Sequence, residues 1–481
     1  MNTLPMKPLK SGLVNFPGAT PESTALVAEL LHKDYVAHHC FHNDQNFSNH
    51  LSHHILSLHD LGAPIEWIRA MYEKEAATQR PLHLNGVPAN KASAIDETNW
   101  TSKLGRENAN RYSDYLSFFS GEIGKRGVHA ALERYVFSPE ANANGTFMLA
   151  RFIGGLLHPI IETGLGLEFG QDFMVAQGLA QAALATPVGA GVMHAESGIP
   201  EIRSGSSATL LSLFRELYDA PELTPAPYET QQITPERLGK WVASNPERAA
   251  AIRDIYAKWT FNIQDGNEED FAKKVEECMW QATLLLGATG KPNRKPRMDF
   301  YLMHFLTGSL FLGVVVEAIK SPLHKAQLLQ AYVRSAALFI ILRGRPRIDL
   351  SLVMSYPVCP TPPKTPNSVV GTVGSGGSGS PWLALLNNAT MHTEPHVVKS
   401  IRMLFYCAQK YGGTPGGGVI GAVDGGGKET HKGAATLDGT LFVRVAGNMT
   451  DAVGWVAHGD NERFWDFGGI GWEEAWIQDD V

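Results

Sequence analysis

Histidine, a residue type that binds transition metals, occurs in four well-separated, apolar stretches of the sequence. The stretches are "NHLSHHIL", "FIGGLLHP", "FYLMHFLT" and "EPHVVKSI", and their candidate ligands are His50, His54, His158, His304 and His396. Neutral imidazole is a favoured ligand of iron, zinc and copper. A single histidine on an apolar helix is more often a hydrogen-bonded core residue. Histidines from separate segments that converge inside a helical bundle would instead suit a divalent metal ion.

The first of these stretches holds three histidines, which differ in their expected direction. Apolar residues at Phe47, Leu51, Ile55 and Leu58 define one face of the predicted helix. His50 and His54 lie on or beside that face at spacing i, i+4, whereas His53 points more toward Asn49 and Asp60. His50 and His54 are therefore the histidines of this block that we expect to face the core.

A lysine one turn after His396 raises a second chemical question. Lys399 interrupts a segment, Glu394 to Cys407, whose apolar residues cover nearly the whole circumference of a helix. A lysine ammonium is rarely buried without a partner. Either Lys399 reaches water or a salt-bridge partner, or its desolvated neutral amine reacts with carbon dioxide. The resulting carbamate would be an anionic oxygen ligand for a metal.

A carboxylate ligand is less evident than the histidines. Glu162 lies one turn after His158 and could serve, or it could be a helix-end residue near Gly164. Pro159 is expected to kink or break the helix at His158 and so to free backbone groups, a feature that often marks functional sites.

Two familiar site motifs occur but lack the structural context that they require. Gly374, Gly376 and Gly379 form G-x-G-x-x-G, yet a dinucleotide site needs a strand before the glycines and a helix that begins within them. His-x-Asp occurs twice, at His42 and His458, without the β-barrel that carries such an iron site. We therefore reject a nucleotide site at this run.

The composition excludes several functional classes. The chain of 481 residues has a net charge of -7 and no long basic stripe, which argues against a general nucleic-acid binder. Its one tight basic cluster, "RGRPR" at 343–347, is either an exposed loop or an anion contact. We expect neither a signal peptide nor a membrane span. Four widely spaced cysteines indicate reduced thiols and a cytoplasmic location.

Helical periodicity dominates the sequence and predicts a mainly α protein. Residues 22 to about 345 consist of apolar segments with helical spacing, separated by Gly, Pro or Asn. The best strand candidate is "GTLFVRVAG" at 439–447. Loops rich in Gly, Pro and Ser span 356–381 and 411–433. We predict one domain over 1–481: a large helical, bundle-like fold with a small irregular or β C-terminal part.

Five blocks, in order along the chain, resemble the questin oxidase-like family of fungal aromatic polyketide pathways. They are "NHLSHHILSLHDLGAP", "GGLLHPIIETGLGLEFG", "DFYLMHFLTG", "EPHVVKSIRMLFY" and "RFWDFGGIGWEEAW", and they span about residues 40 to 476. The resemblance implies an oxidoreductase that opens a ring of an anthraquinone-type substrate with molecular oxygen. Members have been described as Baeyer–Villiger monooxygenases, and at least one resembles a non-haem iron dioxygenase with four histidines and a carboxylated lysine.

Carried onto this sequence, the resemblance implies an Fe(II) site. His158, His304 and His396 match the family's histidine blocks, and Lys399 matches its lysine. The fourth ligand comes from "NHLSHH", where we favour His50, then His54, without excluding His53. The chain departs from the family pattern at Glu162, where relatives often have a second histidine.

The implied partners are O2 and a small aromatic polyketide, with neither nucleic acid nor a membrane. Thr307, one turn after His304, either hydrogen-bonds the substrate or bound oxygen, or bonds back to its own helix. The alternative function is an NADPH-dependent Baeyer–Villiger monooxygenase that acts on the same substrate class. The sequence leaves the oligomeric state and the exact quinone open.

Overall fold

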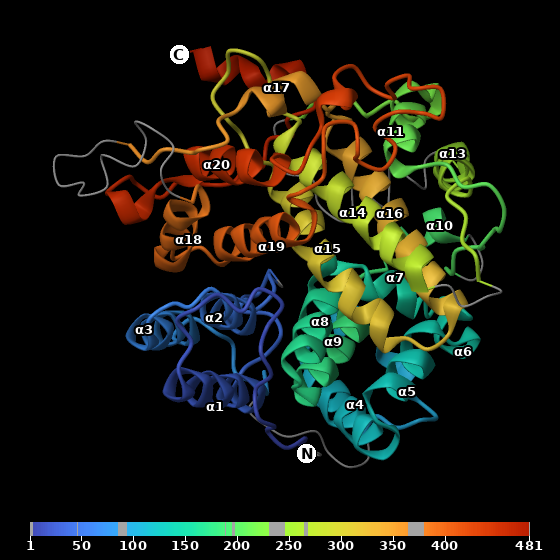
Figure 1. Cartoon of the computed structure of the whole chain (residues 1–481). Helices are drawn as coiled ribbons and strands as arrows, with labels where there is room; N and C mark the ends of the chain where they lie inside the picture. Colours follow the sequence, from blue (N-terminus) through green and yellow to red (C-terminus); the bar gives the residue numbers. More distant parts are fainter. Residues whose placement is uncertain are drawn as a thin grey trace. The chain divides into compact units, whose positions relative to one another are not determined.

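The protein is mainly α-helical, as predicted. The computed structural model describes residues 3–45, 47–84, 94–187, 189–194, 198–229, 246–263, 268–363 and 380–480. Within these ranges every regular element is a helix, and extended pairing is limited to isolated bridges such as the one between Asp299 and Asp466. Figure 1 shows the helices and their labels.

The chain divides into two compact units, and each is built from more than one segment. The first unit comprises Met1–Ile202, Phe261–Phe271 and Phe311–Ser335, and the second comprises Arg203–Thr260, Ala272–Leu310 and Ala336–Val481. The boundary passes through three continuous helices: α14 (Glu268–Gly287), α15 (Phe300–Ala318) and α16 (Pro322–Leu342). Each of these helices therefore contributes residues to both units.

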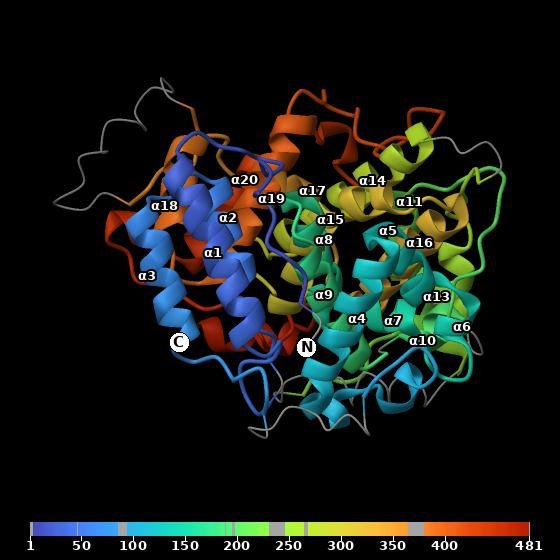
Figure 2. The ribbon, with the colours of Figure 1, turned by 90° about the horizontal axis from the view of Figure 1, so that it is seen from below.

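Three helices form the N-terminal part of the first unit. They are α1 (Pro21–Ala37), α2 (Leu51–Asp60) and α3 (Ile65–Ala76), and they pack against one another (Figures 1 and 2). Every residue of α2 is buried, including its histidines. Because α2 is covered on all sides, its polar residues must find partners inside the protein.

The centre of the first unit is a pair of helices that lie side by side, α8 (His158–Phe169) and α9 (Asp172–Leu184). Helix α8 also contacts α2, and α9 also contacts α4 (Tyr112–Arg126). Close approach of α8 and α9 depends on Gly178, where an added Cβ would clash with Thr163. The unit also contains the following short helices: η2 Trp100–Lys103, η3 Arg106–Arg111, α5 Val128–Leu132, η4 Glu133–Phe137, α6 Pro139–Asn142, α7 Met148–Phe152, η5 Gly155–Leu157 and α10 Ala190–Met193.

In the second unit, α19 (Pro395–Tyr411) packs against α20 (Leu441–Val453) and α18 (Trp382–Met391). A second group of helices consists of α11 (Leu210–Asp219) and α13 (Pro246–Tyr256). The other described helices that lie wholly in the second unit are η6 Pro221–Leu223, α17 Leu350–Ser355, η7 Ala434–Thr436, η8 Val456–His458 and η9 Glu473–Asp480.

The predicted strand at 439–447 is wrong, because this segment begins helix α20. The alternation in "LFVRV" suits a strand, but over five residues it is also compatible with a helix. Buried residues recur at Leu441, Val445, Met449 and Val453, four residues apart, so they form one helical face. Packing of that face on α19 overrides the strand preference of the two valines.

The two predicted loops are irregular where the structure describes them. In the first loop, residues 356–363 and 380–381 carry no regular helix or strand, and the three glycines of the G-x-G-x-x-G run lie outside the described residues. In the second, residues 412–433 form turns closed by a bridge between Val423 and Glu429.

Helix α15 is long and apolar enough to cross a membrane, but 72% of its most apolar window is buried inside the structure. Core helices of soluble proteins pass the same test of length and composition. It is the sole candidate span among the described residues.

Candidate functional site

Two of the predicted ligands meet in the first unit. The Nε2 atoms of His158 and His50 are 2.8 Å apart. The Nδ1 of His158 is 2.6 Å from the carbonyl oxygen of Gly155, which can only accept a hydrogen bond, so Nδ1 carries the proton. The lone pair of His158 is therefore on Nε2, directed at His50. This contact is either a hydrogen bond from His50 or the spacing of two ligands around one ion.

An unusual backbone turn sets the position of His158. Gly155, Leu156 and Leu157 all have positive φ, at 56°, 55° and 65°. Leucine seldom adopts this left-handed conformation, which costs about 1–3 kcal/mol per residue. The turn follows the end of α7 at Phe152, and α8 begins after it with Pro159 in its first turn. The predicted break of the helix at Pro159 is therefore present. The same turn brings the Gly155 carbonyl to the His158 ring.

A polar cluster adjoins this pair. Glu162 accepts hydrogen bonds from the Ser52 hydroxyl at 2.7 Å and from Nε2 of His53 at 3.0 Å. The His53 ring stacks on that of His158, with centroids 5.9 Å apart and planes at 17°. His53 lies two turns before Asp60 on the same face of α2, and because α2 is buried on every side this face meets α8. Glu162 thus orients His53 and is no helix-end residue.

The ring of His54 has a different partner from that of His50. His50 is the N-cap residue that precedes α2, and His54 lies in the first turns of this helix. The Nδ1 of His54 pairs with the carboxylate of Glu75 on α3. The structure therefore brings His50, and not His54, into contact with His158, while the ligand role of both residues stays a prediction.

The other two predicted histidines meet in the second unit. The rings of His304 and His396 have centroids 4.8 Å apart and planes at 63°. The Nδ1 of His304 is 2.8 Å from the carbonyl oxygen of Phe300, and that of His396 is 2.6 Å from Oε1 of Glu394. Both partners are acceptors, so in each neutral ring Nδ1 is protonated and Nε2 holds the lone pair.

A buried ion pair fixes the start of the helix that carries His304. The Asp299 carboxylate accepts from the backbone N–H groups of Tyr301 and Leu302, at 2.9 and 3.1 Å, and so caps α15. Its second oxygen accepts from Nε of Arg343 at 2.6 Å. Burial raises the pKa of Asp299, and the Arg343 guanidinium opposes this rise.

Glu394 performs three tasks at the start of α19. Its carboxylate accepts from the backbone N–H of His396 at 3.2 Å, from the His396 ring and, at 2.5 Å, from Nε1 of Trp465. The side chain therefore caps the helix, orients the ring and connects it to the C-terminal block.

Aromatic rings surround the second pair. Phe300 lies edge-to-face against both His304 and His396, with centroids 4.7 and 5.2 Å away. Phe467 stacks on Phe300 at 4.5 Å. These contacts make the C-terminal block a wall beside the two histidines.

Lys399 and Thr307 occupy buried positions near these rings along their helices. Lys399 is 5% exposed and lies one turn after His396 on α19. Thr307 is 1% exposed, and its hydroxyl is 3.3 Å from the carbonyl oxygen of His304. The back-bond to its own helix, one of the two alternatives for Thr307, is therefore present.

Three residues that support the histidines were not predicted from the sequence: Asp299, Glu394 and Ser52. Two of them carried a readable signal, because an acidic residue just before a helix, as in "DFYLMHF" and "EPHVVK", is typical of an N-cap. Ser52 carried none, since its role depends on the packing of α2 against α8.

The relatives of this chain define its class. Questin oxidase of Aspergillus terreus is 27% identical over 382 residues, which cover 78% of this chain and 78% of that protein. The Baeyer–Villiger oxidase mdpL of Emericella nidulans is 28% identical over 401 residues, or 81% and 83% of the two chains. The Baeyer–Villiger oxidase GME11358 of Pestalotiopsis microspora is 27% identical over 352 residues, or 71% and 75%. The protein is therefore an oxidoreductase.

The family model of questin oxidase-like proteins matches residues 47–404. This range contains all the predicted ligands, from His50 to Lys399. The chain belongs to the questin oxidase-like family.

Proposed function

We propose that this enzyme opens a ring of an anthraquinone-type aromatic polyketide with O2 at a non-haem ferrous ion. Its ligands are His50, His158, His304 and His396, together with a carbamate formed on Lys399. The observation that carries the proposal is the hydrogen bonding of the imidazole rings. In three of the four histidines, Nδ1 donates to a carbonyl or carboxylate oxygen, which leaves Nε2 for a metal ion. Metal-binding histidines almost always donate their second N–H in this way.

The spacing of the first pair supports a shared ion. Imidazole ligands lie about 2.0–2.1 Å from a divalent metal, so two neighbouring ligands at a right angle are about 3 Å apart. The 2.8 Å between Nε2 of His50 and Nε2 of His158 is close to that value. Imidazole donors with one carboxylate-like oxygen suit iron.

Chain continuity supports assigning both pairs to one ion. His304 and Phe311 lie two turns apart on the same face of α15. Phe311 packs so closely against α8 that a Cβ added at Gly164 would clash with its ring. Because α8 begins at His158, a single continuous helix links the segments that carry His158 and His304.

Lys399 is the remaining donor. It is buried and one turn from His396, so its amine lies on the same helical face as a ligand. Carboxylation replaces an ammonium, which burial disfavours, with an anion that a metal ion neutralises. His54, held by Glu75, remains the second choice after His50 in its block.

The ferrous ion, when bound, supplies the activation of O2 and of the substrate's phenolate. The chain's own residues do the rest. The Phe300 carbonyl and the Glu394 carboxylate hold the rings of the second pair in place. Asp299 caps the helix of His304, and Glu162 orients His53 beside the first pair. Phe300 and Phe467 offer flat apolar surface for a polycyclic ring and exclude water from that side.

The test is anaerobic reconstitution with Fe(II), measurement of bound iron, addition of an anthraquinone and then O2, and mass spectrometry of the product. The wild-type enzyme should bind one iron and insert oxygen from 18O2. Lys399→Ala and His304→Ala should each lose most of the iron while they keep the circular dichroism of a helical protein. Full iron occupancy in Lys399→Ala would reject the ligand role of the lysine.

A second candidate function is an NADPH-dependent Baeyer–Villiger monooxygenase that acts on the same substrate class. The printed names of several relatives favour it. This alternative predicts stoichiometric consumption of NADPH during turnover. Turnover that needs Fe(II) and O2, and no reduced nucleotide, would decide for the dioxygenase.

We also propose a cytoplasmic location. Three of the four cysteines, Cys40, Cys278 and Cys407, are buried and unbridged, and burial raises the pKa of each thiol. Such thiols suit a reducing compartment. Fluorescence microscopy of a tagged chain would test this location.

A further inference from the structure

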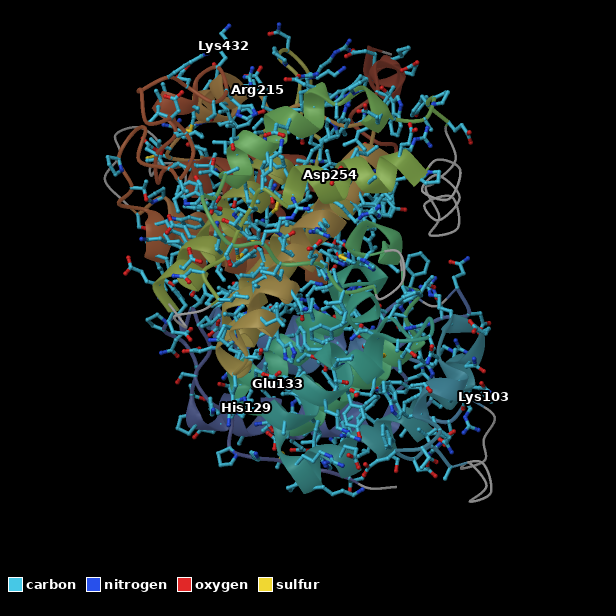
Figure 3. All side chains as sticks on the ribbon, turned by 90° about the vertical axis from the view of Figure 1, so that its right-hand side faces the viewer. Lys103, His129, Glu133, Arg215, Asp254 and Lys432 are labelled. Atoms are coloured by element: carbon cyan, nitrogen blue, oxygen red, sulfur yellow. The ribbon has the colours of Figure 1, made fainter. Side chains whose placement is uncertain are left out.

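A hollow lies in the second unit, at the end of α11. Its volume is about 740 Å³, within the range of small-molecule sites. Its walls come from α11, from the basic segment 343–347 with the residues that follow it, and from the end of the second glycine-rich loop. Arg215 and Lys432 from two of these walls lie near the same end of the molecule in Figure 3.

Positive charge dominates the lining. Lys291 and Glu473 pair with each other and cancel. The remaining charged groups of the lining are four cations, Arg215, Arg345, Arg347 and Lys432, and one anion, Asp349. The carboxylate of Asp349 already accepts from the backbone N–H of Leu352, as the cap of α17. An excess of cations therefore faces the hollow.

Two of the guanidinium groups are fixed in position. Arg345 donates through Nη1 to the Ala220 carbonyl oxygen at 2.9 Å, and Arg347 donates through Nη2 to that of Tyr218 at 3.2 Å. Arg347 also lies 5.1 Å above the Tyr218 ring. Each of these bonds uses one nitrogen of a group that carries five N–H donors, so donors remain for a ligand. A fixed guanidinium loses little entropy when it binds an anion.

The backbone at Arg345 is strained. Its φ is 54° and follows Gly344 at 85°, so a non-glycine residue occupies the left-handed region. Such conformations cost about 1–3 kcal/mol and cluster at ligand-binding sites. This left-handed conformation occurs where Arg345 lines the hollow.

His431 provides an independent sign of a missing ligand. Its side chain lines the hollow, is 8% exposed, and neither ring nitrogen has a hydrogen-bond partner among the described residues. Burial lowers its pKa to about 4, and Arg215 and Arg347 add to this effect against Asp219. The ring is therefore neutral, with one N–H donor and one acceptor unused. Buried polar groups without partners are rare and costly.

We propose that this hollow binds an organic phosphate, a small molecule that carries one or more phosphate groups on an organic body. Guanidinium groups recognise phosphate oxygens through paired N–H donors, and the His431 N–H adds a donor at the floor. The volume exceeds what inorganic phosphate alone would fill. The site shares no residue with the proposed iron ligands and does not depend on the proposed function.

The test is isothermal titration calorimetry of the full chain with ADP, inorganic phosphate and adenosine as probes. ADP should bind, inorganic phosphate should bind more weakly, and adenosine should bind more weakly still. In the double variant Arg215→Glu with Lys432→Glu, the Kd for ADP should rise at least roughly tenfold. Both side chains are exposed and make no hydrogen bond or ion pair among the described residues, so the fold should persist.

His431→Phe and Lys103→Glu complete the experiment. His431→Phe keeps a buried aromatic ring without its nitrogens and should weaken ADP binding severalfold. Lys103→Glu, a charge reversal at an exposed lysine of the first unit, should leave the Kd unchanged. Absence of ADP binding, equal binding of adenosine and ADP, or an unchanged Kd in the double variant would each overturn the proposal. Inorganic phosphate as tight as ADP would overturn its organic part.

Discussion

The two histidine pairs differ in how far their support depends on side chains. In the first unit, a backbone carbonyl holds His158, and three successive residues with positive φ place that carbonyl. In the second unit, a backbone carbonyl holds His304 as well, but the carboxylate of Glu394 holds His396. Asp299, paired with Arg343, also caps the helix of His304.

This difference determines how each pair responds to change. A backbone carbonyl survives any side-chain substitution and fails only when the turn changes shape. A carboxylate is removed by a single mutation, but while present it makes its histidine a more basic ligand. We therefore expect the second pair to be the more sensitive to substitution and the first to be the more tolerant.

The largest effect should come from Asp299→Asn in the second unit. The variant leaves the buried Arg343 without its closest counter-charge, so the free energy of unfolding should fall by about 3–5 kcal/mol. Iron affinity should also fall, because the ion pair with Arg343 no longer holds the capping side chain at the start of α15. Urea denaturation and iron titration measure the two effects. Unchanged iron affinity in a destabilised variant would show that the Asp299–Arg343 pair does not position His304.

Glu394→Ala removes the partner of the His396 ring and should lower iron affinity about 10–100-fold. Loss of the cap should also cost about 1 kcal/mol of stability. Thr20→Ala is the matched control, since it removes the cap of α1 without touching a histidine. The control should lose similar stability and no iron. Equal iron affinity in both variants would remove the distinction between the pairs.

Glu122→Gln tests whether a buried carboxylate network in the first unit contributes to stability and to iron affinity. Burial raises the pKa of Glu122, but hydrogen bonds from Arg126, Lys125 and Tyr135 outweigh burial and lower it to about 2, from 4.5. Glu122 therefore contributes stability above pH 4.5 that is lost as the pH falls toward 2.

The variant should be about 2 kcal/mol less stable than the wild type at pH 7, with a smaller difference at pH 3. Urea denaturation at both pH values gives the comparison. Iron affinity should not change, because this network contacts none of the proposed ligands. A drop in iron affinity as large as that of Glu394→Ala would contradict the contrast between the units.

The smallest effect should come from Gly155→Ala, which tests the backbone support of His158. A Cβ at this position would make ordinary contacts, so the cost is the positive φ, about 1 kcal/mol. Gly145→Ala, at φ 81° with no neighbour for a Cβ, should cost the same. Only Gly155→Ala should weaken iron binding, by a few-fold, as the carbonyl shifts. Identical iron titrations for the two variants would argue against this support.

The sequence predicted the helices well because long apolar segments repeat with a helical period. It failed at 439–447, where the short apolar segment "LFVRV" is compatible with both a strand and a helical period, and packing on α19 decides for the helix. It singled out His50 and His54 as the core-facing histidines of their block, whereas His53 is buried as well, because α2 is covered on every side.

The candidate site was predicted less completely than the fold. The histidines stood out by residue type, and the structure joins them as two pairs, His50 with His158 and His304 with His396. Their supports were missed, since the role of Ser52 and the left-handed turn before His158 depend on tertiary packing. The proposed carboxylation of Lys399 is a chemical modification, which no sequence records.

The interleaving of the two units has a consequence for synthesis of the protein. The first unit takes its last segment, Phe311–Ser335, from a stretch that follows much of the second unit in the chain. A ribosome must therefore release well over half of the polypeptide before the first unit can complete its own helices. Neither unit can be expressed as a continuous fragment, and a stop codon after Ile202 would yield a product that lacks two of the three segments of the first unit.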